Sequence, residues 1–415
     1  MTRRRIAALL LVAAAAAGPV AAGDPPPLPV AKASSGAVPP TAPPADEAGP
    51  RLDARAWALV DARTGDVLAA HEGDERLPIA SATKLMTAYV ALKELPLRKR
   101  VTAAPYTPTT AESLLGLQPG ERISVRDLLY GLILQSGNDA AFDLALAAAG
   151  SEDRFVRLMN RYAAALGLSD THYANPIGLD EPGNYSTASD LTALARRLMA
   201  IPGFAKISAS RGAVLRSLRP PRRIDTRVDL LYELPWATGI KTGYTLGAGY
   251  VLVGAGRLDG VQLISAVLGT ESEAARDEET EELLTYGFSL HRHEVPVSKR
   301  EELARPAVRW TDEELPLRAA RSVAIGVRRE QQLTVEVEAP SEVEGPIRRG
   351  AALGQATVSL DGLPVARVPL LAARAVPEAS ALDKVRDVIG DNLGWLLLAV
   401  FAILVAIVLL GRRRR

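Results

Sequence analysis

Short apolar runs and helical apolar repeats alternate along most of the chain and predict an α+β domain. Short apolar runs bounded by turn residues predict strands at 56–60, 67–70, 239–242, 250–256 and 261–269. The Asp-Gly pair at Asp259 joins the last two strands as a tight hairpin. Apolar residues at helical spacing predict helices at 85–92, 128–134, 152–166, 187–199 and 273–284. A hairpin first, a helical middle and strands at the end favour one sheet covered by helices.

A different pattern begins after Val295 and predicts a second, smaller domain. Alternating apolar and polar residues predict short strands at 308–310, 322–325, 333–338, 356–360 and 365–368. The Asp361-Gly362 pair adds a further hairpin turn. We therefore predict an all-β domain over 295–377, followed by an amphipathic linker over 378–392.

The two ends of the chain carry segments of another kind. Residues 1–22 have the basic start, apolar centre and small-residue end of a secretory signal, and 23–52 form a Pro- and Ala-rich segment predicted to be disordered. Residues 393–410 are almost wholly apolar and predict a transmembrane helix, and the arginines at 411–415 predict a cytoplasmic tail. The predicted catalytic domain at 53–292 would then be exported and tethered to the cell membrane, on its extracytoplasmic side.

Composition narrows the function classes. The chain has 49 Lys and Arg against 48 Asp and Glu, so no overall positive field favours a nucleic-acid partner. It has no cysteine, which excludes disulfides, thiol catalysis and cysteine-bound metals. Four histidines are present, and His291 and His293 flank Arg292 in a charged segment where solvated side chains are expected. No H-E-x-x-H or comparable metal spacing occurs, so neither a metal nor a cofactor is predicted.

The first candidate for chemistry is the S-x-x-K sequence from Ser81 to Lys84. Residues three apart on a helix lie on the same face, so a serine hydroxyl and a lysine amine here can meet in one cavity. The alternative is a capped core helix with a solvated lysine, because serine and threonine favour helix starts. The four residues by themselves do not decide between the two interpretations.

Two further short sequences carry polar side chains at the ends of predicted elements. Ser136 and Asn138 follow the helix at 128–134, where Gly and Asn are also common simply as helix breakers. Lys241 and Thr242 lie on a predicted strand and suit an anionic substrate, although they also suit an exposed edge strand.

Taken together, S-x-x-K, S-x-N and K-T-G in this order form the motif set of β-lactamases and penicillin-binding proteins, with Gly137 in place of the Asp of S-D-N. No G-x-S-x-G elbow offers a competing serine nucleophile. The combination therefore favours acyl transfer on a serine.

On these motifs, residues from about 56 to 288 resemble the low-molecular-mass penicillin-binding proteins that act as serine-type D-alanyl-D-alanine carboxypeptidases. The matching runs are 79–87, 136–140, 175–179, 186–188 and 239–245. The resemblance implies a β-lactamase/DD-peptidase-like catalytic domain: an antiparallel sheet with helices on its faces and a helical subdomain. It also implies a peptidoglycan stem peptide ending in D-Ala-D-Ala as substrate and β-lactams as acylating inhibitors.

The resemblance implies a role for each matching residue. Ser81 is the nucleophile, Lys84 its base, Ser136 a proton relay, and Asn138 a group that orients the substrate amide or the base. The residues expected to bind substrate are Lys241, Thr242, Gly243, Tyr244 and, from a more divergent sequence, Arg227. Arg227 would bind a carboxylate, with a surface salt bridge as the alternative. Tyr244 stands where the family often has His, so only its backbone N–H is expected to act, with that of Ser81, as an oxyanion donor.

Three other functions stay open at this point. A β-lactamase or a peptidoglycan DD-endopeptidase would use the same motifs on the same scaffold. An inactive cell-wall-binding homologue would keep the fold without the chemistry.

Overall fold

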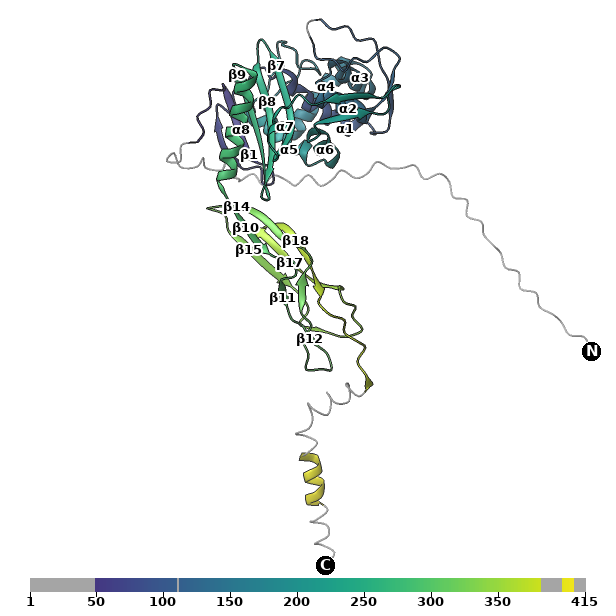
Figure 1. Ribbon diagram of the computed structural model, residues 1–415, viewed down its shortest axis with the longest axis vertical. Helices are drawn as coiled ribbons and strands as arrows, with labels where there is room; N and C mark the ends of the chain where they lie inside the picture. Colours follow the sequence, from purple (N-terminus) through teal and green to yellow (C-terminus); the bar gives the residue numbers. More distant parts are fainter. Residues whose placement is uncertain (1–48, 110–111, 382–397, 407–415) are drawn as a thin grey trace, which may run out of the picture. The chain divides into compact units, whose positions relative to one another are not determined.

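The structure, a computed structural model, describes residues 49–109, 112–381 and 398–406 (Figure 1). The predicted signal segment at 1–22 lies outside the described residues, as do most of the predicted linker at 23–52 and the arginines at 411–415. The bounds predicted for the domains stay predictions.

A five-stranded antiparallel sheet in the order β2-β1-β9-β8-β7 forms the centre of the first domain (Figure 1). Its strands are β1 (Ala56–Asp61), β2 (Val67–His71), β7 (Ala237–Thr245), β8 (Gly249–Leu258) and β9 (Val261–Thr270). Asp259 and Gly260 both have positive φ, which the tight β8–β9 hairpin requires. All five predicted strands are confirmed, and β7 lies at one edge of the sheet.

Helices cover both faces of this sheet. They are α1 (Lys84–Glu94), α2 (Val125–Leu134), α3 (Asn138–Ala149), α4 (Glu152–Leu166), α5 (Ala188–Met199), α6 (Pro202–Ser208), α7 (Leu230–Glu233) and α8 (Glu273–Ser289). Along β1, Ala56, Ala58 and Val60 pack into the core formed with α1 to α6, whereas Trp57 and Leu59 pack with α8. Both faces of β1 are therefore buried, which explains its continuous apolar sequence.

Side-chain caps fix where several of these helices begin. Ser124 accepts a hydrogen bond from the backbone N–H of Asp127 at the start of α2, and Thr187 accepts one from Asp190 at the start of α5. The five predicted helices are confirmed, but α3 was not predicted, because the residues after α2 were interpreted as a loop. Short elements were also missed: η1 (Ala80–Thr83), β3 (Arg100–Thr102), β4 (Arg122–Ser124), β5 (Gly212–Leu215), β6 (Arg222–Asp225), and the helices α6 and α7.

The second domain is all-β, as predicted. Its strands are β10 (His291–Val297), β11 (Glu302–Ala304), β12 (Ala307–Val308), β13 (Leu317–Ala319), β14 (Val323–Arg328), β15 (Leu333–Glu338), β16 (Glu342–Val343), β17 (Ala352–Leu360) and β18 (Leu363–Ala372). The largest sheet has the order β11-β13-β18-β17-β15. Its core includes Val297, Leu317, Val358 and Leu370, all fully buried.

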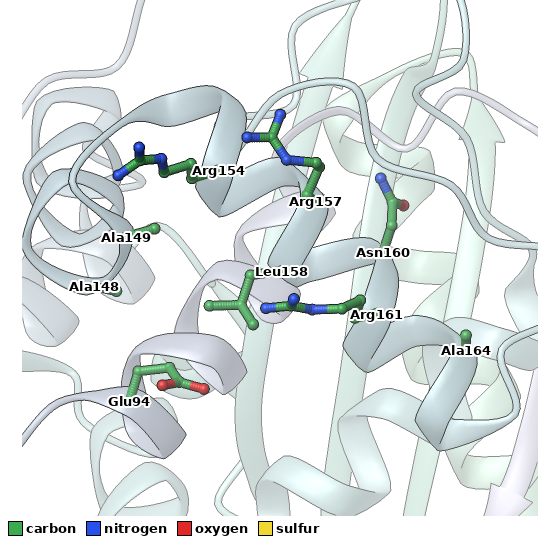
Figure 2. A pocket seen from close by; sticks show the side chains of 9 residues that line it. All are labelled: Glu94, Ala148, Ala149, Arg154, Arg157, Leu158, Asn160, Arg161 and Ala164. Carbon is green, nitrogen blue, oxygen red and sulfur yellow. The ribbon is translucent and has the colours of Figure 1, made fainter.

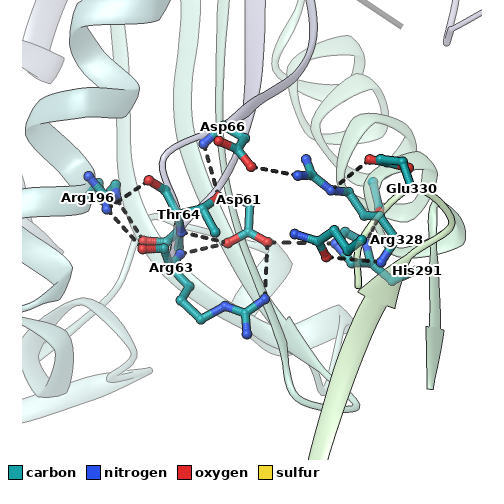
Figure 3. A network of polar contacts seen from close by, with 11 residues as sticks. Asp61, Arg63, Thr64, Asp66, Arg196, His291, Arg328 and Glu330 are labelled. Atoms are coloured by element: carbon teal, nitrogen blue, oxygen red, sulfur yellow. Dashed lines mark hydrogen bonds and ion pairs between the residues drawn. The ribbon is translucent and has the colours of Figure 1, made fainter. Parts of the chain in front are cut away.

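Polar contacts connect the β1–β2 turn of the first domain to β10 and β14 of the second (Figure 3). Arg328 Nη2 donates to Asp66 Oδ2 at 2.6 Å, and His291 Nε2 lies 3.7 Å from Asp61 Oδ2. Burial works against charge on Asp61, but His291 and the backbone N–H of Thr64 hold the pKa of that carboxyl below its usual value. The His291 side chain is only 2% exposed, so the expectation of a solvated histidine was wrong there.

The predicted transmembrane helix at 393–410 requires a correction. Within the described parts of the chain, no helix is both long enough and apolar enough to cross a membrane. Of the predicted segment, only residues 398–406 are described, and they are helical.

Candidate active site

The Ser81–Lys84 pair is held where the chain passes from η1 into α1. Lys84 Nζ donates to Ser81 Oγ at 2.8 Å and also to the carbonyl oxygen of Ile177. Lys84 is completely buried, and burial is the main reason that its pKa falls to about 7. A lysine with that pKa has a large neutral fraction near neutral pH and can accept the proton of the hydroxyl beside it.

Two glycines let neighbouring backbones approach Ser81 closely. A Cβ on Gly178 would lie 2.0 Å from the carbonyl oxygen of Ala80, and a Cβ on Gly243 would lie 3.0 Å from Ser81 N. Gly178 also has a φ of +90°, which an L side chain rarely adopts. The Gly178 loop and β7 are therefore packed directly against the backbone of the serine.

Ser136 lies in the turn between α2 and α3 with a φ of +58°, in the left-handed region. Its Oγ is buried and has no hydrogen-bond partner in the part of the chain that the structure describes. Buried hydroxyls are normally paired, so an unpaired one in the S-x-N motif fits a group that pairs with substrate. A Cβ on Gly137 would lie 2.9 Å from both Asp139 Oδ1 and Leu115 N, which explains why Asp does not occupy the middle of this motif.

Asn138 is the first residue of α3 rather than part of a loop. Its backbone N–H donates to the carbonyl oxygen of Ser113 at 2.8 Å, and its side-chain Nδ2 donates to Glu112 Oε2 at 2.6 Å. The residue is only 5% exposed. The side-chain amide is thus held by the segment that precedes β4.

Lys241 and Thr242 lie on the edge strand β7 and are buried. Lys241 Nζ donates to the carbonyl oxygen of Thr242 at 2.6 Å. Burial, and after it the positive charges of Lys84 and Arg227, hold the pKa of Lys241 well below its usual value. Tyr244 is half exposed and its ring packs against that of Tyr250 at a tilt of 36°, with ring centroids 4.4 Å apart.

Arg227 is exposed and donates from Nη1 to Ser113 Oγ at 2.8 Å, rather than to a carboxylate. Its positive charge lowers the pKa of both Lys84 and Lys241, so the three cationic side chains face a common region. Bringing like charges together is unfavourable unless an anion joins them. The site therefore suits a substrate that carries a carboxylate.

Some residues that shape this site were not predicted from the sequence. They are Glu112 and Tyr106 beside Asn138, Asp139 below the 112–117 segment, and the Ile177 carbonyl group on Lys84. Glu112 and Tyr106 lie in a polar stretch without periodicity, where no sequence signal marks them. The run 175–179 matches the family sequence, but nothing in it predicts that the Ile177 carbonyl group accepts a hydrogen bond from Lys84.

A separate groove of about 780 Å³ lies along α4 and contains none of the motif residues. Figure 2 shows its arginines, Arg154, Arg157 and Arg161, on one helix. The volume of this groove therefore does not locate the serine–lysine pair. The hydrogen bond between Ser81 and the buried Lys84 is the better guide to the candidate site.

Comparison with known proteins shows which family the chain is similar to. Residues 43–272 match the family described as D-alanyl-D-alanine carboxypeptidase, and residues 306–378 match the penicillin-binding protein 5 C-terminal domain. The chain is 34% identical to D-alanyl-D-alanine carboxypeptidase DacC of Escherichia coli over 359 residues, which are 81% of this chain and 88% of that protein. It is 39% identical to DacB2 of Mycobacterium tuberculosis over 244 residues, 57% of this chain and 83% of that one. The crystal structure of penicillin-binding protein 5 from Haemophilus influenzae matches with a TM-score of 0.56 and 29% identity, covering 80% of this chain and 99% of that one.

Proposed function

The chain belongs to the D-alanyl-D-alanine carboxypeptidase family, and we propose that Ser81 and Lys84 are the nucleophile and base with which it acts. It is a serine-type enzyme that removes the terminal D-alanine from peptidoglycan stem peptides, and it binds penicillin. One observation gives the strongest support to these two residues. It is the 2.8 Å hydrogen bond between Ser81 and a fully buried lysine whose pKa is about 7.

In the acylation step, neutral Lys84 takes the proton of Ser81 Oγ, and the oxygen attacks the carbonyl carbon between the two D-alanines. The C–N bond of that amide breaks, and the Ser136 hydroxyl gives its proton to the departing amine while it takes the one held by Lys84, which returns Lys84 to its neutral form. Free D-alanine leaves, and the shortened stem remains esterified to Ser81. The buried, unpaired Ser136 Oγ supports this relay.

In the deacylation step, a water molecule attacks the ester carbonyl and gives up a proton to Lys84. The ester C–O bond breaks, Lys84 returns the proton to Ser81 Oγ, and the shortened stem leaves with a new carboxylate. The same base thus serves both steps, and no cofactor takes part.

The substrate's terminal carboxylate would lie among Lys241, Thr242 and Arg227. The lowered pKa of Lys241 supports this position, since burial and the charge of Arg227 disfavour its ammonium form and a bound carboxylate would favour it. The backbone N–H groups of Ser81 and Tyr244 would donate to the oxyanion, while Gly243 keeps that part of β7 close to the serine.

Peptidoglycan lies outside the cytoplasm, so we infer that the enzyme acts on the extracytoplasmic side. Because a β-lactam presents an amide and a carboxylate in a similar arrangement, it would acylate Ser81 in the same way.

The test compares wild-type protein with the Ser81→Ala variant. Wild type should bind a fluorescent penicillin covalently, one to one, and release one D-alanine from a pentapeptide stem, as weighed by mass spectrometry. Ser81→Ala should fold normally and do neither. Rapid hydrolysis of penicillin would instead indicate a β-lactamase, and cleavage of cross-linked dimers without D-alanine release would indicate an endopeptidase. Wild-type protein that does none of these would be an inactive homologue.

A further inference from the structure

A short segment, residues 112–117, crosses the start of α3, and one carboxylate there accepts from three of its backbone N–H groups. Asp139 Oδ1 accepts from the backbone N–H of Leu115 at 2.7 Å, and Oδ2 accepts from those of Gly116 and Leu117 at 2.7 and 2.9 Å. The Ser113 carbonyl accepts from the backbone N–H of Asn138. Because hydrogen bonds to a charged acceptor are the stronger ones, the segment has a fixed place beside the S-x-N motif.

The first residue of this segment, Glu112, directs its carboxylate at Asn138. Glu112 Oε2 accepts from Asn138 Nδ2 at 2.6 Å and from the hydroxyl of Tyr106. Glu112 Oε1 accepts from the backbone N–H of Thr109 at 3.0 Å and, more weakly, from its hydroxyl at 3.3 Å. All the groups that meet this carboxylate are donors.

This arrangement decides which way the Asn138 amide points. An ionised carboxylate can only accept hydrogen bonds, so the amide nitrogen must face Glu112 and the amide oxygen must face away from it. The oxygen is then left to accept from Lys84 or from an N–H of the substrate. With the amide reversed, two oxygens would meet and the active-site side would lose its acceptor.

We propose that Glu112 is a positioning residue for the acyl-transfer reaction, which holds the Asn138 amide in the one orientation that presents its oxygen to the reacting groups. Glu112 does not touch the substrate or the serine, and it acts through Asn138. The proposal rests on the proposed function of Ser81, Lys84 and Asn138. None of the three motifs contains Glu112.

A second consequence follows from its charge. Burial lowers the pKa of Lys84, the negative charge of Glu112 is the next influence and raises it, Arg227 lowers it, and Asp139 raises it. The positive charge of Lys84 in turn lowers the pKa of the buried Lys241. Hydrogen bonds from Asn138 and Tyr106 outweigh the burial of Glu112 and keep its pKa below the usual value, so it is charged at neutral pH. Removing this charge would lower the pKa of Lys84 further.

The experiment measures the acylation rate of the full chain by a fluorescent penicillin, and D-alanine release, across pH. Glu112→Ala should lower both rates by about tenfold to 100-fold, as expected when a reacting geometry is loosened. In Glu112→Ala and in the similarly sized Glu112→Gln, the acid limb of the pH profile should move to lower pH. The control is Glu94→Gln, because Glu94 also accepts from a tyrosine, Tyr162, at 2.6 Å but lies at the end of α1. It should leave rate and profile unchanged.

A double-mutant cycle separates positioning from a general structural role. If Glu112 acts through Asn138, then adding Glu112→Ala to Asn138→Ala should cost almost nothing further. An equal loss in both backgrounds, or Glu112 variants with wild-type rates and an unshifted profile, would overturn the proposal. If Glu112→Ala does not fold, as judged by its thermal midpoint, then Glu112→Gln and its pH profile decide. Wild-type protein that fails both assays would contradict the proposed function and not this inference.

Discussion

The active-site region and the all-β domain of this protein are stabilised in opposite ways. Around Ser81, the chain buries Lys84, Lys241, Asn138 and an unpaired Ser136 hydroxyl. Over the described residues 297–376, the only buried polar residue is Gln331, and the core is aliphatic. Buried charges and unpaired polar groups cost stability, whereas aliphatic packing supplies it. The difference indicates that one region carries the chemistry and that the other is present for its packing.

The largest effect on the acylation rate is expected when the buried Lys84 is replaced, and an exposed lysine of the β domain provides the comparison. Lys84→Met keeps a similar volume but removes the proposed base, which donates to Ser81, so the acylation rate by penicillin should fall by about 10⁴-fold or more. Stability should change little, because the cost of burying the amine is removed while the Ile177 carbonyl group loses its donor. The matching change in the β domain, Lys299→Met, alters an exposed side chain and should leave the rate unchanged. A Lys84→Met enzyme that still acylates quickly would mean that another group is the base.

A second comparison uses two glycines that both have positive φ. In Gly178→Ala the new Cβ would lie 2.0 Å from the Ala80 carbonyl oxygen, so the backbone that holds Ser81 must move. We expect an acylation rate lower by about 100-fold and a loss of about 3 kcal/mol in unfolding free energy. In Gly362→Ala the Cβ would meet nothing within 4 Å, so only backbone strain of about 1 kcal/mol remains. Similar losses of activity in the two variants, measured with thermal denaturation alongside, would contradict the close approach at Gly178.

The pH dependence of wild-type acylation follows from the burial of Lys84. Because burial lowers its pKa to about 7, the amine is neutral above that pH and charged below it. The rate should therefore be level at higher pH and fall about tenfold per pH unit below pH 7. Rapid-quench labelling with a fluorescent penicillin measures this limb. If the rate instead fell below a pH of about 10, the ordinary pKa of a solvated lysine, then burial would not lower the pKa of Lys84.

The smallest effect on activity is expected in the β domain. Leu370→Ala opens a cavity in an aliphatic core and should cost about 2–5 kcal/mol of that domain's stability. The acylation rate should change by less than about twofold at a temperature where the domain stays folded. Residues that are far apart and share no partners act independently, so a cavity in the β domain should not alter the site. A large fall in rate with the fold intact would show that the two domains are coupled. The hydrogen bond between Asp66 and Arg328 would then be the first contact to test by mutation.

Much of the fold was predictable because its strongest elements have local signals. The buried β1, the Asp259-Gly260 hairpin and the capped helix α2 each follow from periodicity, turn chemistry or a capping residue. The helix α3 was missed because its first residues also make a good helix break. The predicted membrane span was wrong, since the described residues hold no helix long enough to cross.

The order and spacing of S-x-x-K, S-x-N and K-T-G determined the family and named the residues of the site, because each motif is contiguous in the chain. What those residues can do depends on distant parts of the chain. The depressed pKa of Lys84 needs burial by the whole domain. The Ile177 carbonyl group that accepts from its Nζ is 93 residues away in the sequence. The orientation of the Asn138 amide needs Glu112, and the place of Ser81 needs Gly178 and Gly243. Desolvation, hydrogen-bond direction and close packing are properties of three-dimensional neighbours, so only the tertiary structure decided them.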